Sequence, residues 1–210
     1  MLPDCLSAEE ERRCRQLLAG TTARLRSRPA AAAVLVPLCL VRGVPALLYT
    51  LRSRRLVGRH KGEVSFPGGK CDPTDQDVIQ TALRETQEEL GLEVTKEQVW
   101  GVLQPVYDRG KATIVPVLAN VGPLDLQSLR PNPEEVDEVF ELALAHLLQT
   151  QNQGYTHFCQ GGHFRYTLPV FLHGPHRVWG LTAIITAFAL KLMAPGIYQP
   201  CLAVPELPRG

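Results

Sequence analysis

The sequence has little net charge, few aromatic residues and no long apolar run, and each absence excludes a class of protein. Its formal net charge is only +1, so no overall field attracts nucleic acid or an anionic membrane. Aromatic residues make up 6%, and the basic cluster at 52–61 contains none that could stack bases. The longest apolar runs, at 30–41 and 181–190, are shorter than the roughly 20 residues that span a bilayer. We therefore predict a soluble protein that binds neither nucleic acid nor membranes.

The cysteines show no pairing pattern. There is no CxxC pair and no metal-ligand spacing with histidine among the six, which are Cys5, Cys14, Cys39, Cys71, Cys159 and Cys201. Disulfide frameworks belong to short secreted chains, whereas 210 residues can bury a full core. We predict free thiols in a reducing compartment.

Hydrophobic patterning predicts a mixed α/β domain without internal repeats. Strands are expected at 33–41, 46–52, 63–66, 99–106 and 112–121, a hairpin at 155–160 and 163–172, and helices at 76–90 and 178–193. We divide the chain into an arginine-rich segment at 1–28, a catalytic domain at 29–196 and a proline-containing tail at 197–210.

The predicted helix at 76–90 separates an apolar stripe from an acidic one. Asp75 is the expected N-cap, and Gly91 stands at the expected left-handed end. Glu85, Glu88 and Glu89 lie three and four residues apart on the acidic, wetter stripe, where they repel one another. Divalent cations such as Mg²⁺ or Mn²⁺ remove that repulsion, because they select hard oxygen ligands. The alternative is a solvated acidic face.

The residues around this helix resemble a known family signature. The run Gly69-(x5)-Asp75-(x8)-Arg84-Glu85-Thr86-Gln87-Glu88-Glu89-Leu90-Gly91-Leu92 resembles the Nudix box, G-x5-E-x7-R-E-U-x-E-E-x-G-U with U aliphatic. It departs from the box at Asp75, at the extra residue before Arg84 and at Thr86.

The resemblance implies an α/β/α sandwich with a mixed sheet. It also implies that Glu85, Glu88 and Glu89 ligate Mg²⁺ or Mn²⁺, that the Gly69 carbonyl contributes, and that Arg84 orients Glu85 or Glu88. The reaction implied is hydrolysis of a diphosphate linkage. The chain has no GKS/T loop that would indicate an ATPase.

A second resemblance concerns the substrate. The segments LLYTLRS at 47–53 and GEVSFPGG at 62–69 resemble the LLTxRS…GxVxFPGG signature of the coenzyme A diphosphatase branch, although Gly58 stands where an arginine is expected and Arg59 follows it. This implies cleavage of coenzyme A and acyl-CoA to 3′,5′-ADP and (acyl-)4′-phosphopantetheine. The alternatives are another nucleoside diphosphate compound (ADP-ribose, a dinucleotide or an RNA cap) or a Nudix module that binds a nucleotide without turnover.

A basic cluster lies between the two signature halves. It comprises Arg52, Arg54, Arg55, Arg59, His60 and Lys61. Coenzyme A carries a 3′-phosphate besides its diphosphate, and a compact cationic patch beside the metals would bind it. We predict substrate contacts from Arg52, Arg59, Lys61, Gly68 and Gly69, and we expect at least half of the basic cluster only to solubilise a loop.

Four acids follow a proline-rich turn at 130–133. They are Glu134, Glu135, Asp137 and Glu138. One of them could be a further metal ligand or the general base, and a solvated cluster is the alternative.

The first 28 residues are ambiguous. They contain six arginines, as a mitochondrial transit peptide would, but also Asp4, Glu9, Glu10 and Glu11, which such peptides avoid. Ser7 and Glu10 form a capping box typical of a permanent helix. We expect a mitochondrial location, with a cytoplasmic one as the alternative. No peroxisomal tripeptide ends the sequence. We also expect that removing 1–28 leaves the core intact.

Overall fold

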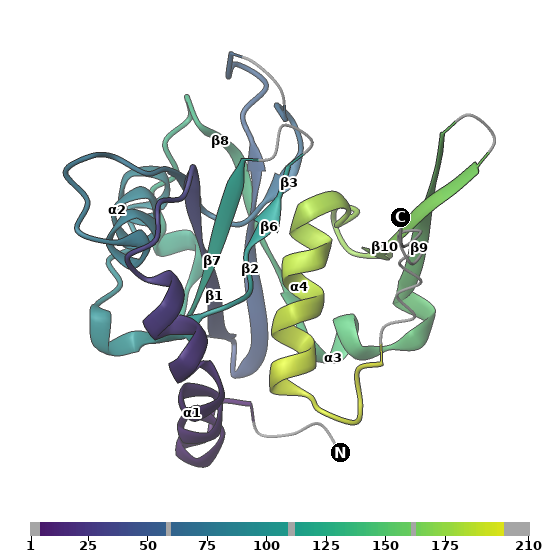
Figure 1. Ribbon diagram of the computed structural model, residues 1–210, viewed down its shortest axis with the longest axis horizontal. Helices are drawn as coiled ribbons and strands as arrows, with labels where there is room; N and C mark the ends of the chain where they lie inside the picture. Colours follow the sequence, from purple (N-terminus) through teal and green to yellow (C-terminus); the bar gives the residue numbers. More distant parts are fainter. Residues whose placement is uncertain (1–4, 58–59, 109–111, 161–162, 200–210) are drawn as a thin grey trace, which may run out of the picture.

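The computed structural model describes residues 5–57, 60–108, 112–160 and 163–199, and an eight-stranded mixed sheet forms its centre (Figure 1). The strands run in the order β3-β2-β1-β7-β5, with β8 on β2, β4 on β1 and β6 on β7. Their bounds are β1 Ala32–Val41, β2 Val44–Arg52, β3 Val64–Ser65, β4 Gly68–Lys70, β5 Val99–Val102, β6 Val106–Tyr107, β7 Thr113–Pro123 and β8 Val136–Ala143. β1 and β7 are parallel, and every other pair in this sheet is antiparallel.

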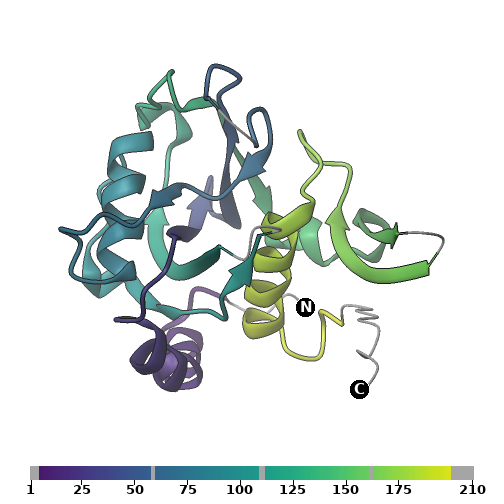
Figure 2. The ribbon, with the colours of Figure 1, turned by 45° about the horizontal axis from the view of Figure 1, so that its top comes forward.

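Helices cover both faces of this sheet, as Figures 1 and 2 show. The helices are α1 Ala8–Leu25, α2 Val78–Leu90, α3 Leu144–Leu148 and α4 Gly180–Met193, with short 3-10 turns at Lys96–Gln98, Leu126–Ser128 and Thr150–Asn152. On one face α2 packs Val78, Ile79 and Ala82 against the central strands. α4 packs on the opposite face. The predicted α/β/α sandwich with a mixed sheet is confirmed.

The predicted hairpin forms a separate two-stranded sheet. β9 spans Gln153–Gln160 and β10 spans His163–Phe171, antiparallel to it. Beyond α4, Tyr198 is buried and stacks on Phe171, so the described start of the predicted tail belongs to the core. Residues 200–210 of that tail lie outside the described residues.

Two helix starts differ from the prediction. α2 begins at Val78, and its N-cap is Asp77, whose side chain accepts a hydrogen bond from the Gln80 backbone N–H. The expectation for Asp75 was wrong because that carboxylate binds Arg84 instead. α4 begins at Gly180, two residues later than expected.

The N-terminal helix is part of the packed structure. Ser7 caps α1 as predicted, accepting from the Glu10 N–H. Leu18 is buried, and the Thr22 hydroxyl accepts a hydrogen bond of 2.9 Å from the Val102 N–H in β5. A Cβ at Gly101 would lie 2.7 Å from the Leu18 Cβ, so helix and strand are in close contact. These contacts count against the expectation that 1–28 can be removed without disturbing the core, which stays a prediction.

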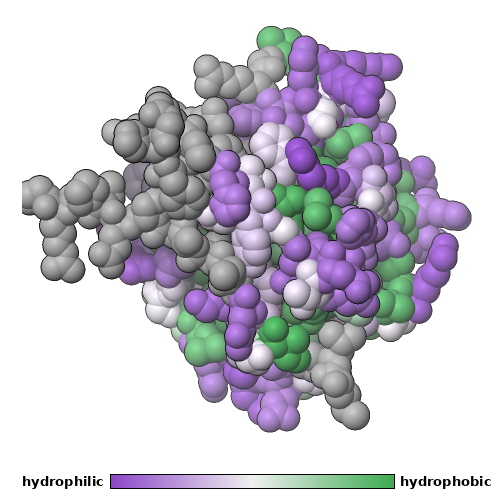
Figure 3. All heavy atoms as spheres, turned by 90° about the vertical axis from the view of Figure 1, so that its right-hand side faces the viewer, coloured by the Kyte–Doolittle hydropathy of each residue, from purple (hydrophilic) through white to green (hydrophobic). Residues whose placement is uncertain are grey.

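The side chains on the described surface and the described cysteines can be compared with the predictions made from composition. On the face formed by α4 and the hairpin, hydrophilic side chains predominate among the described residues in view, and hydrophobic ones are scattered (Figure 3). None of the described helices is long and apolar enough to cross a membrane. Cys14, Cys39 and Cys71 are free thiols, as predicted. Cys201 and the side chain of Cys159 lie outside the described part.

Candidate active site and metal centre

The site is built where β4 meets α2. Gly68 and Gly69 pair with Val34 and Ala33 of β1, and Ala33 also pairs with Val115 of β7. Gly68 has a φ of 150°, and a Cβ there would lie 2.5 Å from the Val34 Cα, so only glycine fits this approach. β4 thereby runs directly alongside β1 and beneath the acidic half of α2.

Gly69 lies under the Glu85 carboxylate. The position that a Cβ at Gly69 would take is already occupied by the carboxyl group of Glu85. Glu85 is half-buried, and burial raises its pKa, against the opposing effect of the Arg84 guanidinium. The strand backbone and the first acid of the predicted metal set are therefore in contact.

This contact yields a prediction for Gly69→Ala. The new methyl group must displace the Glu85 carboxylate, which is the far end of a flexible side chain, so we expect little change in stability but a clear loss of turnover. Thermal unfolding and steady-state kinetics measure the two effects. Gly20→Ala is the matched control, since a Cβ there meets nothing within 4 Å. A Gly69→Ala variant with the kinetics of the Gly20→Ala control would show that Glu85 need not occupy this position.

Glu89 is buried, contrary to the prediction that it lies on the wetter stripe. Its side chain accepts a hydrogen bond of 3.0 Å from the Gly68 backbone N–H, and the residue is only 6% exposed. Burial raises the pKa of Glu89 to about 8, and the Gly68 hydrogen bond and the charge of Arg52 only partly oppose this. The tertiary structure buries Glu89 because β4 covers this part of α2.

Arg84 organises the other acids. Its guanidinium donates to Glu85 at 2.9 Å and to Glu88 at 3.2 Å, so it contacts both candidates for orientation. Two further donors form a bidentate pair with Asp75, at 3.0 and 2.9 Å, and this pair holds the pKa of the Asp75 carboxyl well below its usual range. Asp75 therefore anchors Arg84, a role that the sequence pattern alone did not indicate.

The structure brings the three glutamates to one end of α2 but does not turn them toward a common point. Glu85 and Glu88 face Arg84, and Glu89 faces Gly68. Within the described ranges, no group of three or more His, Cys, Asp or Glu side chains is arranged to hold a metal ion. The donor chemistry nevertheless fits a divalent cation, because the half-buried Glu85 and the buried Glu89 are both carboxylates and the charge of Glu85 raises the pKa of Glu89.

Glu135 is the acid of the 134–138 cluster whose charge acts on the acidic helix. Its charge raises the pKa of both Glu85 and Glu89. The others have partners elsewhere: Glu134 pairs with Arg55, Asp137 accepts from the Arg54 N–H, and Glu138 contacts His176. The sequence presented four equivalent acids, and only the fold distinguishes Glu135.

Of the described basic residues at 52–61, Arg52 has the features expected of a residue that binds the substrate. It ends β2, its charge acts on Glu89, and its Nε is buried with no hydrogen-bond partner among the described residues. A buried donor without a partner is costly unless a ligand satisfies it. His60 contacts Glu63 at 2.8 Å, and Lys61 is exposed. Arg59 lies outside the described residues.

Comparison with known proteins shows which family model and which relatives this chain resembles. The family model described as the NUDIX domain matches residues 29–159. The chain is 90% identical, over the full length of both proteins, to "Mitochondrial coenzyme A diphosphatase NUDT8" of Mus musculus. It is 83% identical to the Homo sapiens protein of the same name, over 97% of this chain and 86% of that protein. "Nudix hydrolase 3" of Caenorhabditis elegans is 36% identical over 83% of this chain and 78% of its own length.

Proposed function

Because this chain belongs to the Nudix hydrolase family, we propose that it hydrolyses the diphosphate bond of coenzyme A and acyl-CoA. Water attacks one phosphorus atom, the P–O–P bond breaks, and the products are 3′,5′-ADP and (acyl-)4′-phosphopantetheine. Two relatives at 90% and 83% identity carry this activity in their names. The observation that carries the proposal is the buried Glu89 carboxylate. It accepts a hydrogen bond from the Gly68 N–H, and the charges of Glu85 and Arg52 act on its pKa.

Nudix hydrolases generally use divalent metal ions, and we propose Mg²⁺ or Mn²⁺ here. Glu85, Glu88, Glu89 and the Gly69 carbonyl would hold the ions. A bound cation neutralises diphosphate charge and lowers the pKa of the attacking water. Arg84 orients Glu85 and Glu88 through its hydrogen bonds, and Asp75 keeps Arg84 in place. Glu135 is the proposed further acid, either as a ligand or as the general base.

The substrate contacts are proposed for Arg52, Arg59, Lys61, Gly68 and Gly69. Arg52 supplies the unsatisfied buried donor, and Lys61 is exposed without an ion pair in the described part of the chain. The names of the two relatives support a small-molecule substrate. We propose no nucleic-acid or membrane partner.

A panel of diphosphate compounds tests the function. The full chain is assayed with Mg²⁺ or Mn²⁺ on coenzyme A, acyl-CoA, ADP-ribose, a dinucleotide and an RNA cap, and release of a phosphate monoester is measured. We expect the highest kcat/KM with coenzyme A compounds. A higher value with another compound would support the alternative substrate, and binding without product release would support a non-catalytic module.

We predict a preference for coenzyme A over its 3′-dephospho form. Charge-assisted hydrogen bonds from Arg52 and Lys61 to the 3′-phosphate should favour it by about 1–3 kcal/mol, or about 5- to 150-fold in kcat/KM. An Arg52→Gln/Lys61→Gln variant should reduce this ratio. Arg55→Gln is the control, because Arg55 already pairs with Glu134. Equal kcat/KM for both compounds in the wild-type protein would show that this patch does not bind the 3′-phosphate.

We propose a mitochondrial location, which the names of both relatives state for those proteins. Since α1 packs on β5, deletion of 1–28 would confuse targeting with unfolding. The test is therefore fractionation and protease protection of the full-length protein. Recovery in the cytosolic fraction would favour the cytoplasmic alternative.

A further inference from the structure

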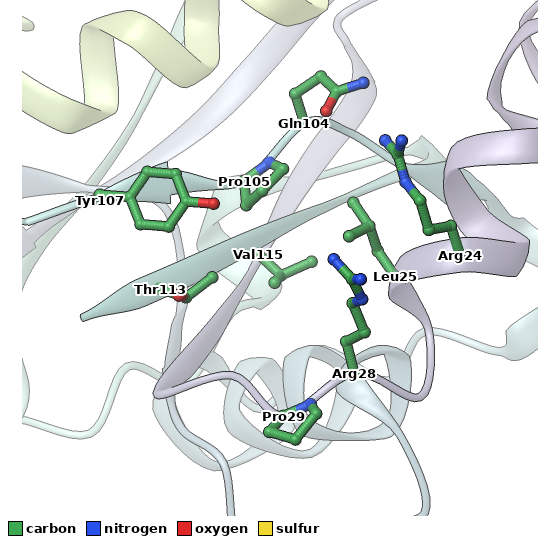
Figure 4. Close-up of a pocket in the computed structure, with 9 residues that line it drawn as sticks. All are labelled: Arg24, Leu25, Arg28, Pro29, Gln104, Pro105, Tyr107, Thr113 and Val115. Atoms are coloured by element: carbon green, nitrogen blue, oxygen red, sulfur yellow. The ribbon is translucent and has the colours of Figure 1, made fainter. Parts of the chain in front are cut away.

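A small cavity opens beside the C-terminal end of α1 (Figure 4). Its volume is about 230 Å³, and its lining includes Arg24, Arg28, Gln104, Tyr107, Thr113 and Val115. Val115 packs in the same cluster as the buried side chains of α2, so the cavity lies on the face of the sheet that α2 covers. It is separate from the basic cluster at 52–61.

The charge of this cavity is uncompensated. No acidic side chain lines it among the described residues, and both arginines are exposed. Within the described ranges, neither Arg24 nor Arg28 has an ion pair or a side-chain hydrogen bond. Neighbouring arginines of this segment differ: Arg13 pairs with Glu10, Arg15 with Glu11 and Arg26 with Asp77. The two guanidinium groups that line the cavity thus have no protein partner among the described residues, a state that the exposed Arg12 of α1 shares but Arg13, Arg15 and Arg26 do not.

Neutral polar groups complete the lining. Figure 4 shows the Arg28 guanidinium and the Tyr107 hydroxyl directed toward the same space between α1 and β7. Tyr107 is 60% exposed, although it lies in a strand, and its ring forms one wall. Gln104 and Thr113 add an amide and a hydroxyl. Such a set of donors without a carboxylate suits an anion.

We propose that this cavity binds a phosphate monoester, which Arg24 and Arg28 neutralise and Tyr107 hydrogen-bonds. The guanidinium fork matches phosphate oxygens bidentately. The volume is below the roughly 300–1,000 Å³ of pockets for drug-sized ligands, so it suits a phosphate group rather than a whole nucleotide. This site goes beyond the proposed function, since binding here requires no hydrolysis.

The phosphate could belong to the substrate or to a separate metabolite. Val115 and Gly69 both pair with Ala33, on its two sides, so two strand spacings, about 10 Å, separate their backbones. A terminal phosphate on a molecule bound at Gly69 is therefore one source, and a free phosphorylated compound is the other. The chemistry of recognition is the same for both.

The test is titration of inorganic phosphate into the full-length, metal-free protein, followed by calorimetry. We expect saturable binding that weakens about tenfold or more in Arg24→Gln/Arg28→Gln. Arg24→Lys/Arg28→Lys keeps the charge but loses the fork, and it should fall between the two. Arg12→Gln is the matched control, because Arg12 is exposed on α1 but does not line the cavity. Thermal unfolding of each variant checks that α1 stays folded.

A second measurement identifies the source. The ratio of kcat/KM for coenzyme A and its 3′-dephospho form is compared between wild type and Arg24→Gln/Arg28→Gln. A ratio that falls toward one assigns the substrate's 3′-phosphate to this cavity in place of Arg52 and Lys61, and an unchanged ratio with lost phosphate binding assigns the bound phosphate to a separate molecule. The proposal is overturned if wild type binds no phosphate saturably, or if Arg12→Gln weakens binding equally. Because calorimetry uses metal-free protein, a failure of the proposed hydrolysis leaves this result interpretable.

Discussion

Replacing Glu89 with glutamine is expected to lower kcat by about 100-fold or more, with a much smaller change in KM. Losses of this size follow the removal of one preorganised electrostatic group that acts mainly in the transition state. The amide keeps an oxygen that can accept the Gly68 N–H, so the local hydrogen bond can survive. Because burial raises the pKa of Glu89 to about 8, the carboxyl is mostly neutral at pH 7 without metal, as the amide is, and we expect the melting temperature without added metal to be no lower than that of wild type.

Glu93→Gln is the matched control for this experiment. Glu93 lies just beyond α2, is exposed, and should be neutral in both measurements. Glu85→Gln should resemble Glu89→Gln in kcat. The variants are chelated and then reloaded with Mg²⁺ or Mn²⁺ before the assay. Near-wild-type turnover by Glu89→Gln under those conditions would contradict the metal assignment.

Replacing Leu18 with alanine is expected to destabilise the protein by about 2–5 kcal/mol, the range for truncating a buried leucine. Leu18 is 6% exposed and packs at Gly101 of β5. The free energy of unfolding in urea measures the effect. Leu17→Ala is the matched control, since Leu17 is 59% exposed and should change stability by less than about 0.5 kcal/mol.

The Leu18 experiment also bears on the predicted domain division. Equal stability of Leu18→Ala and Leu17→Ala would support the expectation that 1–28 can be removed without disturbing the core. Several contacts tie this segment to the rest of the chain. The Arg13 guanidinium donates to the Leu192 carbonyl, and Arg15 donates to the carbonyls of Glu97 and Val99. Arg26 pairs with Asp77 at the start of α2, so α1 and the acidic helix are directly linked.

Local features of the site could be predicted from the sequence. The spacing of Glu85, Glu88 and Glu89 places them together on a helix, because three and four residues span about one turn. Gly91 ends that helix in the left-handed conformation, with a φ of 63°, as a glycine at this position indicates. The strand segments and the hairpin were also recognisable from apolar runs bounded by turn residues.

Tertiary structure decided which groups share the site. Glu89 is buried because β4 lies over it, and β4 is held there by its pairing with β1, more than thirty residues earlier in the chain. Glu135 was one of four similar acids until the turn before β8 placed its charge near Glu85 and Glu89. Asp75 was taken for a helix cap, whereas the fold uses it to hold Arg84.

By itself, the sequence determined what depends on neighbours within a few residues: the acidic helix, its glycine end and the family signature. The structure decided what depends on distant residues, namely the burial of Glu89, the choice of Glu135, the docking of α1 and the convergence of Arg24 and Arg28 with Tyr107. The physical reason is that a helix sets side-chain positions by its own period, whereas strand register and helix docking depend on the burial of apolar surface across the whole chain.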